Sequence, residues 1–273
     1  MPRFARIIGI DYSGAATPTS SLSGLRVFMG PGGDHAGDGK FGETEPVEVL
    51  PPPGRRKYWS RRGIAAWLKD RLLEDLPTLV GIDHGFSFPK RYFETHGVPQ
   101  DWALFLEDFH AHWPTDGDDV YVDFVRDGVL GAGAARSGDA RWRRLTEVAT
   151  RRAKSVFHFD VQGSVAKSTH AGIPWLRYLR LQLGSAVQFW PFDGWDIAPG
   201  RSVIVEAYPA LWSPLYAKGN RTQDQHDAYS IAAWLGRADR NDQLDRLFHP
   251  PLSDTERAVA EFEGWILGVV PSP

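Results

Sequence analysis

Two apolar segments that each run into an aspartate constrain the fold most strongly. The first is RIIGIDY, residues 6–12, and the second is TLVGID, residues 78–83, so Gly-Ile-Asp occurs in both. A strand that is apolar on both faces is typical of the interior of a sheet. We therefore predict two neighbouring central strands of one sheet, with Asp11 and Asp83 at the same edge.

The rest of the hydrophobic pattern predicts a mixed α/β fold. Ser60 offers a cap for one amphipathic helix, and Ser253 with Glu256 offers a capping box for another. A strand that follows a helix indicates a parallel crossover connection. The expected further strands are 22–30, 46–51 and 202–209, and the expected helices are 60–75, 224–239 and 253–270.

The long interval 84–200 separates the fourth predicted strand from the fifth. It is rich in tryptophan, phenylalanine and arginine, and segments 100–112 and 139–155 have helical patterns. We interpret the interval as an insert that elaborates a single domain spanning residues 1–273, and residues 31–43 as a loop.

Composition excludes some kinds of site. The chain has no cysteine, which rules out disulfides, thiolate zinc sites and a cysteine nucleophile and fits a cytoplasmic protein. No stretch approaches the ~20 apolar residues of a membrane helix, and the first residues do not resemble a signal peptide. The net charge of −3 neither favours nor excludes a nucleic-acid partner, and the sequence does not indicate an oligomeric state.

Four acids stand out by position. Asp11, Asp83 and Glu206 end or interrupt apolar strands, and Asp227 shares a helix face with Ile231 and Leu235. A single acid near a strand end is more often a turn or capping residue than a ligand. Four acids on buried elements repel one another and carry desolvation costs, so a divalent cation is expected to neutralise them. Mg²⁺ prefers such oxygen ligands, and paired ions support phosphodiester cleavage.

Four short motifs resemble the family called domain of unknown function 429, a group of predicted nucleases. They are GIDYSGA (9–15), DHGFSFP (83–89), EAYPA (206–210) and HDAYSI (226–231). The order of three antiparallel strands, helix, two parallel strands and helix is also that of the ribonuclease H-like fold. The resemblance implies a ribonuclease H-like mixed sheet with a helical insert before the last strand.

The resemblance further implies a metal-dependent nuclease that hydrolyses nucleic acid, DNA or RNA, with Mg²⁺ or Mn²⁺. The implied catalytic ligands are Asp11, Asp83, Glu206 and Asp227. Ser230 stands where the family often has a second helix aspartate, which weakens the case for a full second metal site. Asp224 is a substitute for it, and His226 is either a general base, an additional ligand or a surface residue.

Cationic and hydroxyl side chains in the insert are candidates for substrate binding. Lys167 and Ser168 lie in a segment that departs from the phosphate-loop pattern, so we expect either a contact to a substrate phosphate or an ordinary loop. Arg151 and Arg152 belong to a cationic run between residues 136 and 154. Such a run either binds nucleic-acid phosphates or is a solvated helix face.

Two other functional classes remain open from the sequence. Actin-like phosphotransferases share the fold and bind ATP at an early Asp-x-Gly turn, but this chain of 273 residues is short for two such domains. A non-catalytic binding module that uses the aromatic insert is the second alternative, because fold does not fix function.

Overall fold

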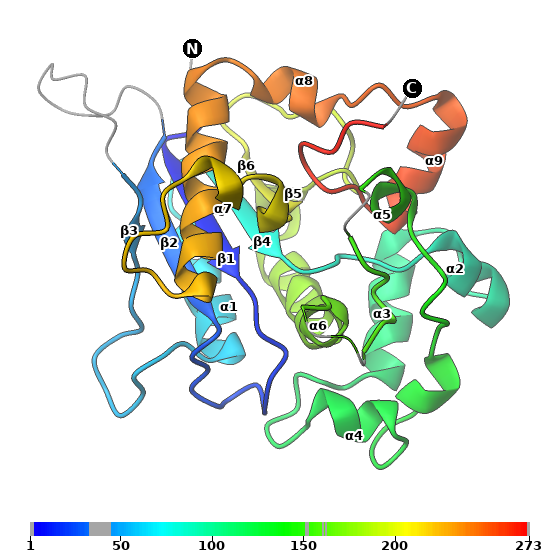
Figure 1. Cartoon of the computed structure of the whole chain (residues 1–273). Helices are drawn as coiled ribbons and strands as arrows, with labels where there is room; N and C mark the ends of the chain where they lie inside the picture. The colour runs from blue at the N-terminus through cyan, green and yellow to red at the C-terminus, as the bar shows by residue number, and fades with distance from the viewer. Residues whose placement is uncertain (1–2, 33–44, 151–152, 160, 162, 272–273) are drawn as a thin grey trace, which may run out of the picture.

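The structure is a computed structural model that describes residues 3–32, 45–150, 153–159, 161 and 163–271. Within them, a mixed sheet has the strand order β3-β2-β1-β4-β6-β5 (Figure 1). β1, β2 and β3 are antiparallel, whereas β1, β4, β6 and β5 are parallel. The strands are β1 Arg6–Asp11, β2 Arg26–Pro31, β3 Val47–Glu48, β4 Thr78–Asp83, β5 Val187–Phe189 and β6 Ser202–Glu206.

Helices cover both faces of the sheet. α7 packs on β1, β2 and β4, and α6 packs against α1 and α3 on the opposite side (Figure 1). The helices are α1 Arg61–Leu72, α2 Lys90–His96, α3 Trp102–His112, α4 Val122–Arg126, α5 Leu145–Ala149, α6 Ala166–Leu183, α7 Gln223–Arg240, α8 Leu244–Phe248 and α9 Asp254–Glu263. No helix of the described ranges has the length and apolar character needed to cross a membrane.

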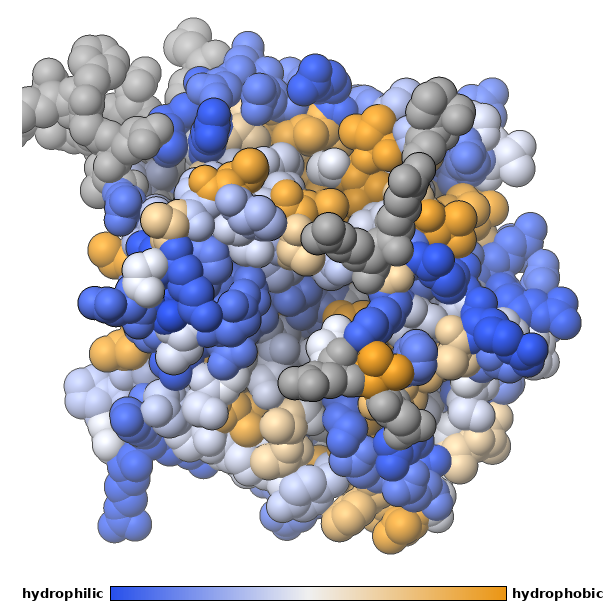
Figure 2. Space-filling view, in the orientation of Figure 1, coloured by the Kyte–Doolittle hydropathy of each residue, from blue (hydrophilic) through white to orange (hydrophobic). Residues whose placement is uncertain are grey.

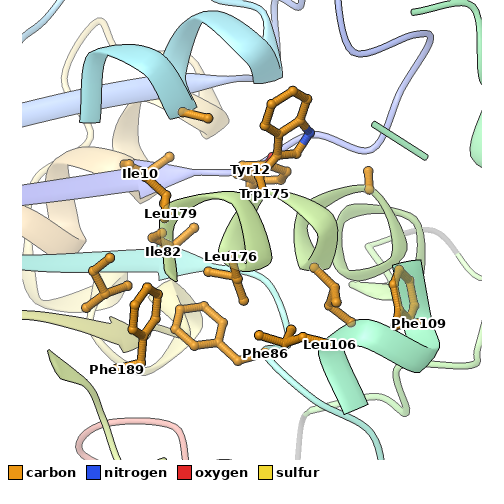
Figure 3. Packing of buried hydrophobic residues seen from close by; sticks show 14 of the residues in the cluster. Ile10, Tyr12, Ile82, Phe86, Leu106, Phe109, Trp175, Leu176, Leu179 and Phe189 are labelled. Atoms are coloured by element: carbon orange, nitrogen blue, oxygen red, sulfur yellow. The ribbon is translucent and has the colours of Figure 1, made fainter. Parts of the chain in front are cut away.

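Alternate residues of the central strands enter two separate hydrophobic clusters. Ile10 and Ile82 pack against Leu179 of α6 in the cluster that also contains the aromatic residues of the insert (Figure 3). Ile7 and Leu79 belong to the cluster on the α7 face. This alternation is the period of two that a strand imposes on its side chains, and it assigns each strand residue to one face.

Two glycines allow α7 to approach the sheet closely. A Cβ atom on Gly9 would overlap the backbone oxygen of Ala228, and one on Gly81 would lie 2.6 Å from Ile231 Cγ2. Any larger side chain at these positions would force α7 outward. The glycine of each Gly-Ile-Asp therefore allows α7 to pack directly on the strand. The aspartate two residues later lies on the same face of the sheet.

Most predicted elements are confirmed, several with shorter bounds, whereas α7 is slightly longer than the predicted helix 224–239. Ser60 caps α1 by accepting from the N–H of Gly63 at 3.1 Å, and Ser253 caps α9. α9 ends at Glu263 instead of 270, and Gly264, which follows, adopts φ 81° and ψ 170°, a conformation that does not continue the helix.

Two features differ from prediction. The segment 139–155 is not a long helix, and only Leu145–Ala149 is helical within its described part. β5 was not predicted, because its three residues are too short to show a strand pattern. The predicted loop 31–43 lies largely outside the described residues.

Candidate functional site

Asp11 and Asp83 form the centre of the site. They are direct partners in the parallel pairing of β1 with β4, and their carboxyl groups lie close enough for each to influence the pKa of the other. Both follow a glycine that contacts α7, so they lie on the α7 face at the carboxyl ends of the strands. Within the described residues, neither carboxylate is paired with a lysine, arginine or histidine. The two acids are brought together as the sequence predicts.

Burial and mutual repulsion make these two groups reluctant to ionise. Burial, followed by the charge of Asp83, raises the pKa of Asp11 well above its ordinary value. Burial and the charge of Asp227 raise the pKa of Asp83 to about 8. Two adjacent carboxyl groups can share one proton because both cannot ionise cheaply. A cation bound between them would relieve the same repulsion.

The first turns of α7 bring two more aspartates toward the pair. Thr222 caps this helix, and its hydroxyl accepts from the N–H of Gln225 at 3.2 Å. Asp227 is half-buried and accepts two hydrogen bonds of 3.0 Å from the amide of Gln223. The charges of Asp224 and Asp227 both raise the pKa of Asp11, which shows that they lie within electrostatic reach.

Glu206 was expected to bind metal together with the three aspartates, but its carboxylate lies elsewhere and is already paired. It pairs in register with Ile82, one residue before Asp83, and follows Ile204 on the face of the insert. Both of its oxygens accept from Arg144, with Nη1–Oε2 and Nη2–Oε1 distances of 2.7 and 2.5 Å. The structure therefore brings Glu206 to the same edge as the aspartates but on the other side of the sheet.

Arg144 is the functional candidate that the sequence did not reveal. It belongs to the cationic run of the insert, yet it is only 1% exposed and also binds Glu147 through Nε at 2.9 Å. Although burial opposes its charge, Glu206 and Glu147 raise the pKa of Arg144 above the ordinary value. A run of arginines resembles a solvated surface, so only long-range packing identifies the member that points inward.

A small hollow of ≈ 40 Å³ opens beside this ion pair. Asp83, Glu206 and Arg144 line it, and Lys154 and Tyr208 contribute to its rim. On the face shown in Figure 2, hydrophilic residues cover the N-terminal half of α7, whereas apolar residues gather toward the C-terminal segment. Asp83 and the ion pair of Arg144 with Glu206 thus line one hollow.

The substrate-binding candidates are mostly engaged in contacts of their own. Lys167 Nζ donates to Asp123 at 2.7 Å, and the Ser168 hydroxyl donates to the carbonyl of Val165 at 2.9 Å. The backbone at Lys167 nevertheless packs against Gly14, three residues after Asp11. The backbone of both residues therefore lies against the turn that follows Asp11, whereas Arg151 and Arg152 are outside the described residues.

Other members of the cationic run and His226 are also held within the protein. Arg136 binds Asp108, and Arg141 binds Asp139, at 2.8 and 2.6 Å respectively. His226 is buried, and its Nε2 lies 3.1 Å from the carbonyl oxygen of Ser213. His226 is thus not the surface residue that was one of the expected alternatives.

The chemistry of the donor set bears on the expected cation. Among the residues that the structure describes, no group of three or more histidine, aspartate or glutamate side chains is placed to hold a metal ion. The Asp11–Asp83 pair does fit Mg²⁺ or Mn²⁺, because Mg²⁺ is usually held by one or two carboxylates with water completing its shell. Asp227 is placed to add charge from α7.

Comparison with models of protein families, with curated proteins and with solved structures finds no match to this chain. A buried carboxyl group on β1, a half-buried one opposite it on β4 and a third carboxylate on α7 create a negative centre suited to a divalent cation.

Proposed function

We propose that this protein is a nuclease that uses Mg²⁺ or Mn²⁺ to hydrolyse phosphodiester bonds of nucleic acid. The observation that carries the proposal is the pair Asp11–Asp83, in which a buried and a half-buried carboxyl group face each other at a strand edge without a cationic partner in the described chain. Such a pair costs free energy of folding. Carboxyl groups whose pKa is raised in this way are found most often at binding and catalytic sites. A divalent cation is the partner that fits oxygen donors best.

The arrangement of elements supports a ribonuclease H-like architecture within this proposal. Three antiparallel strands, a helix and the parallel strands β4 and β6 occur in the order that the motifs imply, with β5 added at the edge. The acids lie on the first strand, the fourth strand and a late helix. This distribution is the one that the resemblance to the family of predicted nucleases implies.

Asp11 and Asp83 would hold the ion, and Asp227 would contribute from α7. The ion would supply electrostatic stabilisation of the charge that develops on the phosphodiester in the transition state. The chain itself keeps the two carboxyl groups in register through the backbone pairing of β1 with β4. Arg144 neutralises Glu206 next to them and limits the repulsion that the anionic substrate meets.

The test is hydrolysis of labelled single-stranded DNA, duplex DNA, RNA and an RNA–DNA hybrid, each with Mg²⁺, Mn²⁺ or EDTA. We expect cleavage of at least one substrate that requires the cation and is lost in Asp11→Asn. Cleavage by Asp11→Asn at the wild-type rate would contradict the proposal, because it would assign the activity to another site or to a contaminant. Absence of cleavage of all four substrates by the wild type would also contradict it.

A further inference from the structure

We infer that Arg144 is a built-in positive charge that removes Glu206 from the ligand set, so that the centre takes one divalent cation. This inference rests on the proposed cation-dependent function. Arg144 is a positioning residue in this scheme, since it acts through Glu206. The inference departs from the expectation that all four acids bind metal.

The register of the parallel strands is the first argument. Ile82 pairs with Glu206, so the neighbour that continues the register beyond Asp83 is Ala207. Val205 and Ala207 belong to the cluster under α7, whereas Ile204 belongs to the cluster on the insert side. Strand alternation therefore directs Glu206 away from the face where Asp11, Asp83 and Asp227 converge.

The second argument is that the oxygens of Glu206 are already engaged. Oε1 accepts from Arg144 Nη2, and Oε2 accepts both from Arg144 Nη1 and from the N–H of Phe86 at 3.1 Å. A bidentate arginine–carboxylate pair fixes the carboxylate in direction as well as in charge. A cation could bind Glu206 only after displacing these donors.

The third argument is that Arg144 is itself fixed from several sides. Its Nε binds Glu147, and its Nη1 also donates to the backbone carbonyl of Glu263 at 3.3 Å. The guanidinium is almost fully buried. Withdrawal of Arg144 would leave Glu147 and Glu206 as buried, unpaired charges, which is strongly unfavourable. The ion pair is therefore a permanent part of the site.

The helix position where a second aspartate was expected holds no carboxylate. Ser230 stands one turn after His226, and its hydroxyl donates to the carbonyl of His226 at 2.6 Å. Glu206 is paired with Arg144, and the Ser230 hydroxyl is hydrogen-bonded within α7. The carboxylates that remain to bind a cation are therefore Asp11, Asp83 and the aspartates of α7 near them. Arg144 thus occupies the oxygens of Glu206 that a second ion would otherwise bind.

The test counts Mn²⁺ ions by electron paramagnetic resonance and measures their affinity by calorimetry. We expect one Mn²⁺ per wild-type chain and, in Asp83→Asn, a loss of affinity on the order of 100-fold because a ligand is removed. Glu206→Gln and Glu147→Gln each remove one carboxylate that pairs with Arg144, but only Glu206→Gln changes a residue that was expected to bind the metal. We expect the two variants to resemble each other, with losses of about tenfold or less.

Arg144→Gln supplies the converse test. It leaves Glu206 without its guanidinium, so we expect a second, weaker Mn²⁺ that disappears again in the double variant Arg144→Gln/Glu206→Gln. Circular dichroism establishes that each variant is folded. If the arginine variants do not fold, the comparison of Glu206→Gln with Glu147→Gln still decides the matter.

Two outcomes would overturn the inference alone. One is a loss in Glu206→Gln as large as in Asp83→Asn while Glu147→Gln is unaffected, and the other is two Mn²⁺ ions bound to the wild type at these acids. Absence of Mn²⁺ binding by the wild type would overturn the proposed function as well.

Discussion

Asp11 and Asp83 lie opposite each other in the pairing of β1 with β4, and their carboxyl groups lie close enough for each to influence the pKa of the other. The backbone of two central strands therefore holds two groups together that repel each other when both are ionised. A pair fixed in this way cannot relax by moving apart, so the protein must accept a shared proton or a cation. The pairing of β1 with β4 therefore couples the fold to the charge state of these two carboxyl groups.

Replacement of Asp11 by asparagine should separate stability from activity. Asp11→Asn keeps a hydrogen-bonding side chain but removes a buried acid, so we expect the cation-free protein to gain about 1–2 kcal/mol in free energy of unfolding. Urea unfolding in EDTA measures this gain, and the nuclease assay measures the accompanying loss of activity. Asp70→Asn, at an exposed position of α1, is the matched control and should change neither quantity. A destabilised Asp11→Asn would argue against repulsion at the pair.

Divalent cations should stabilise the wild type against heat. A ligand that binds only the folded state at 100 times its dissociation constant adds about 2.7 kcal/mol, and for a domain of this size each kcal/mol raises the melting temperature by roughly 2–4 °C. We expect such a rise with Mn²⁺ and a much smaller one in Asp83→Asn. Differential scanning calorimetry with and without EDTA measures it. An equal rise in both proteins would place the bound ion elsewhere.

The glycines under α7 should be as important to the site as the acids. In Gly9→Ala the new methyl group would overlap the backbone of α7 at Ala228, so we expect a loss of about 1–3 kcal/mol in stability. The displaced helix would also carry Asp227 away from Asp11, which should weaken Mn²⁺ binding although no ligand is changed. Gly54→Ala is the control, because its Cβ would meet only Pro52 O at 3.9 Å. Unchanged Mn²⁺ affinity in a destabilised Gly9→Ala would show that Asp227 does not contribute to binding.

The sequence reveals the strand acids because they interrupt runs that are otherwise apolar. Asp11 and Asp83 follow this rule, and both lie where the pattern predicts. Glu206 follows the same rule, but SVIVEA is apolar on both faces, so alternation does not reveal which face the glutamate takes. That choice depends on the register between β4 and β6, which is set by packing between segments far apart in the chain.

The ion pair of Arg144 with Glu206 illustrates the same limit. The two residues are separated by 62 positions, and the arginine lies among neighbours that bind surface acids or backbone carbonyls. Composition alone therefore favours a solvated run. Arg144 differs from its neighbours only because the insert packs on the sheet and buries it. The local sequence pattern therefore cannot predict which arginine pairs with Glu206.

Acid should destabilise the fold through His170 of α6. This ring is fully buried among Phe88, Trp113 and Phe159, and its Nδ1 lies 2.9 Å from the carbonyl of Ala166, which implies that Nδ1 carries the proton of the neutral ring. Burial lowers the pKa of His170 from 6.5 to about 3. The unfolded chain therefore binds a proton near pH 6.5 that the folded chain excludes. The stability contributed by the neutral ring is present above pH 6.5 and is lost as pH falls toward 3.

At pH 5 this linkage should cost about 2 kcal/mol relative to pH 8. His170→Leu removes the group that titrates, so the variant should lose less stability between pH 8 and pH 5 than the wild type by that amount, whatever its stability at pH 8. Urea unfolding at half-unit intervals of pH measures both slopes. Equal slopes would mean that His170 is protonated within the aromatic cluster, in which case its Nε2 proton would need an acceptor that the rings around it do not supply.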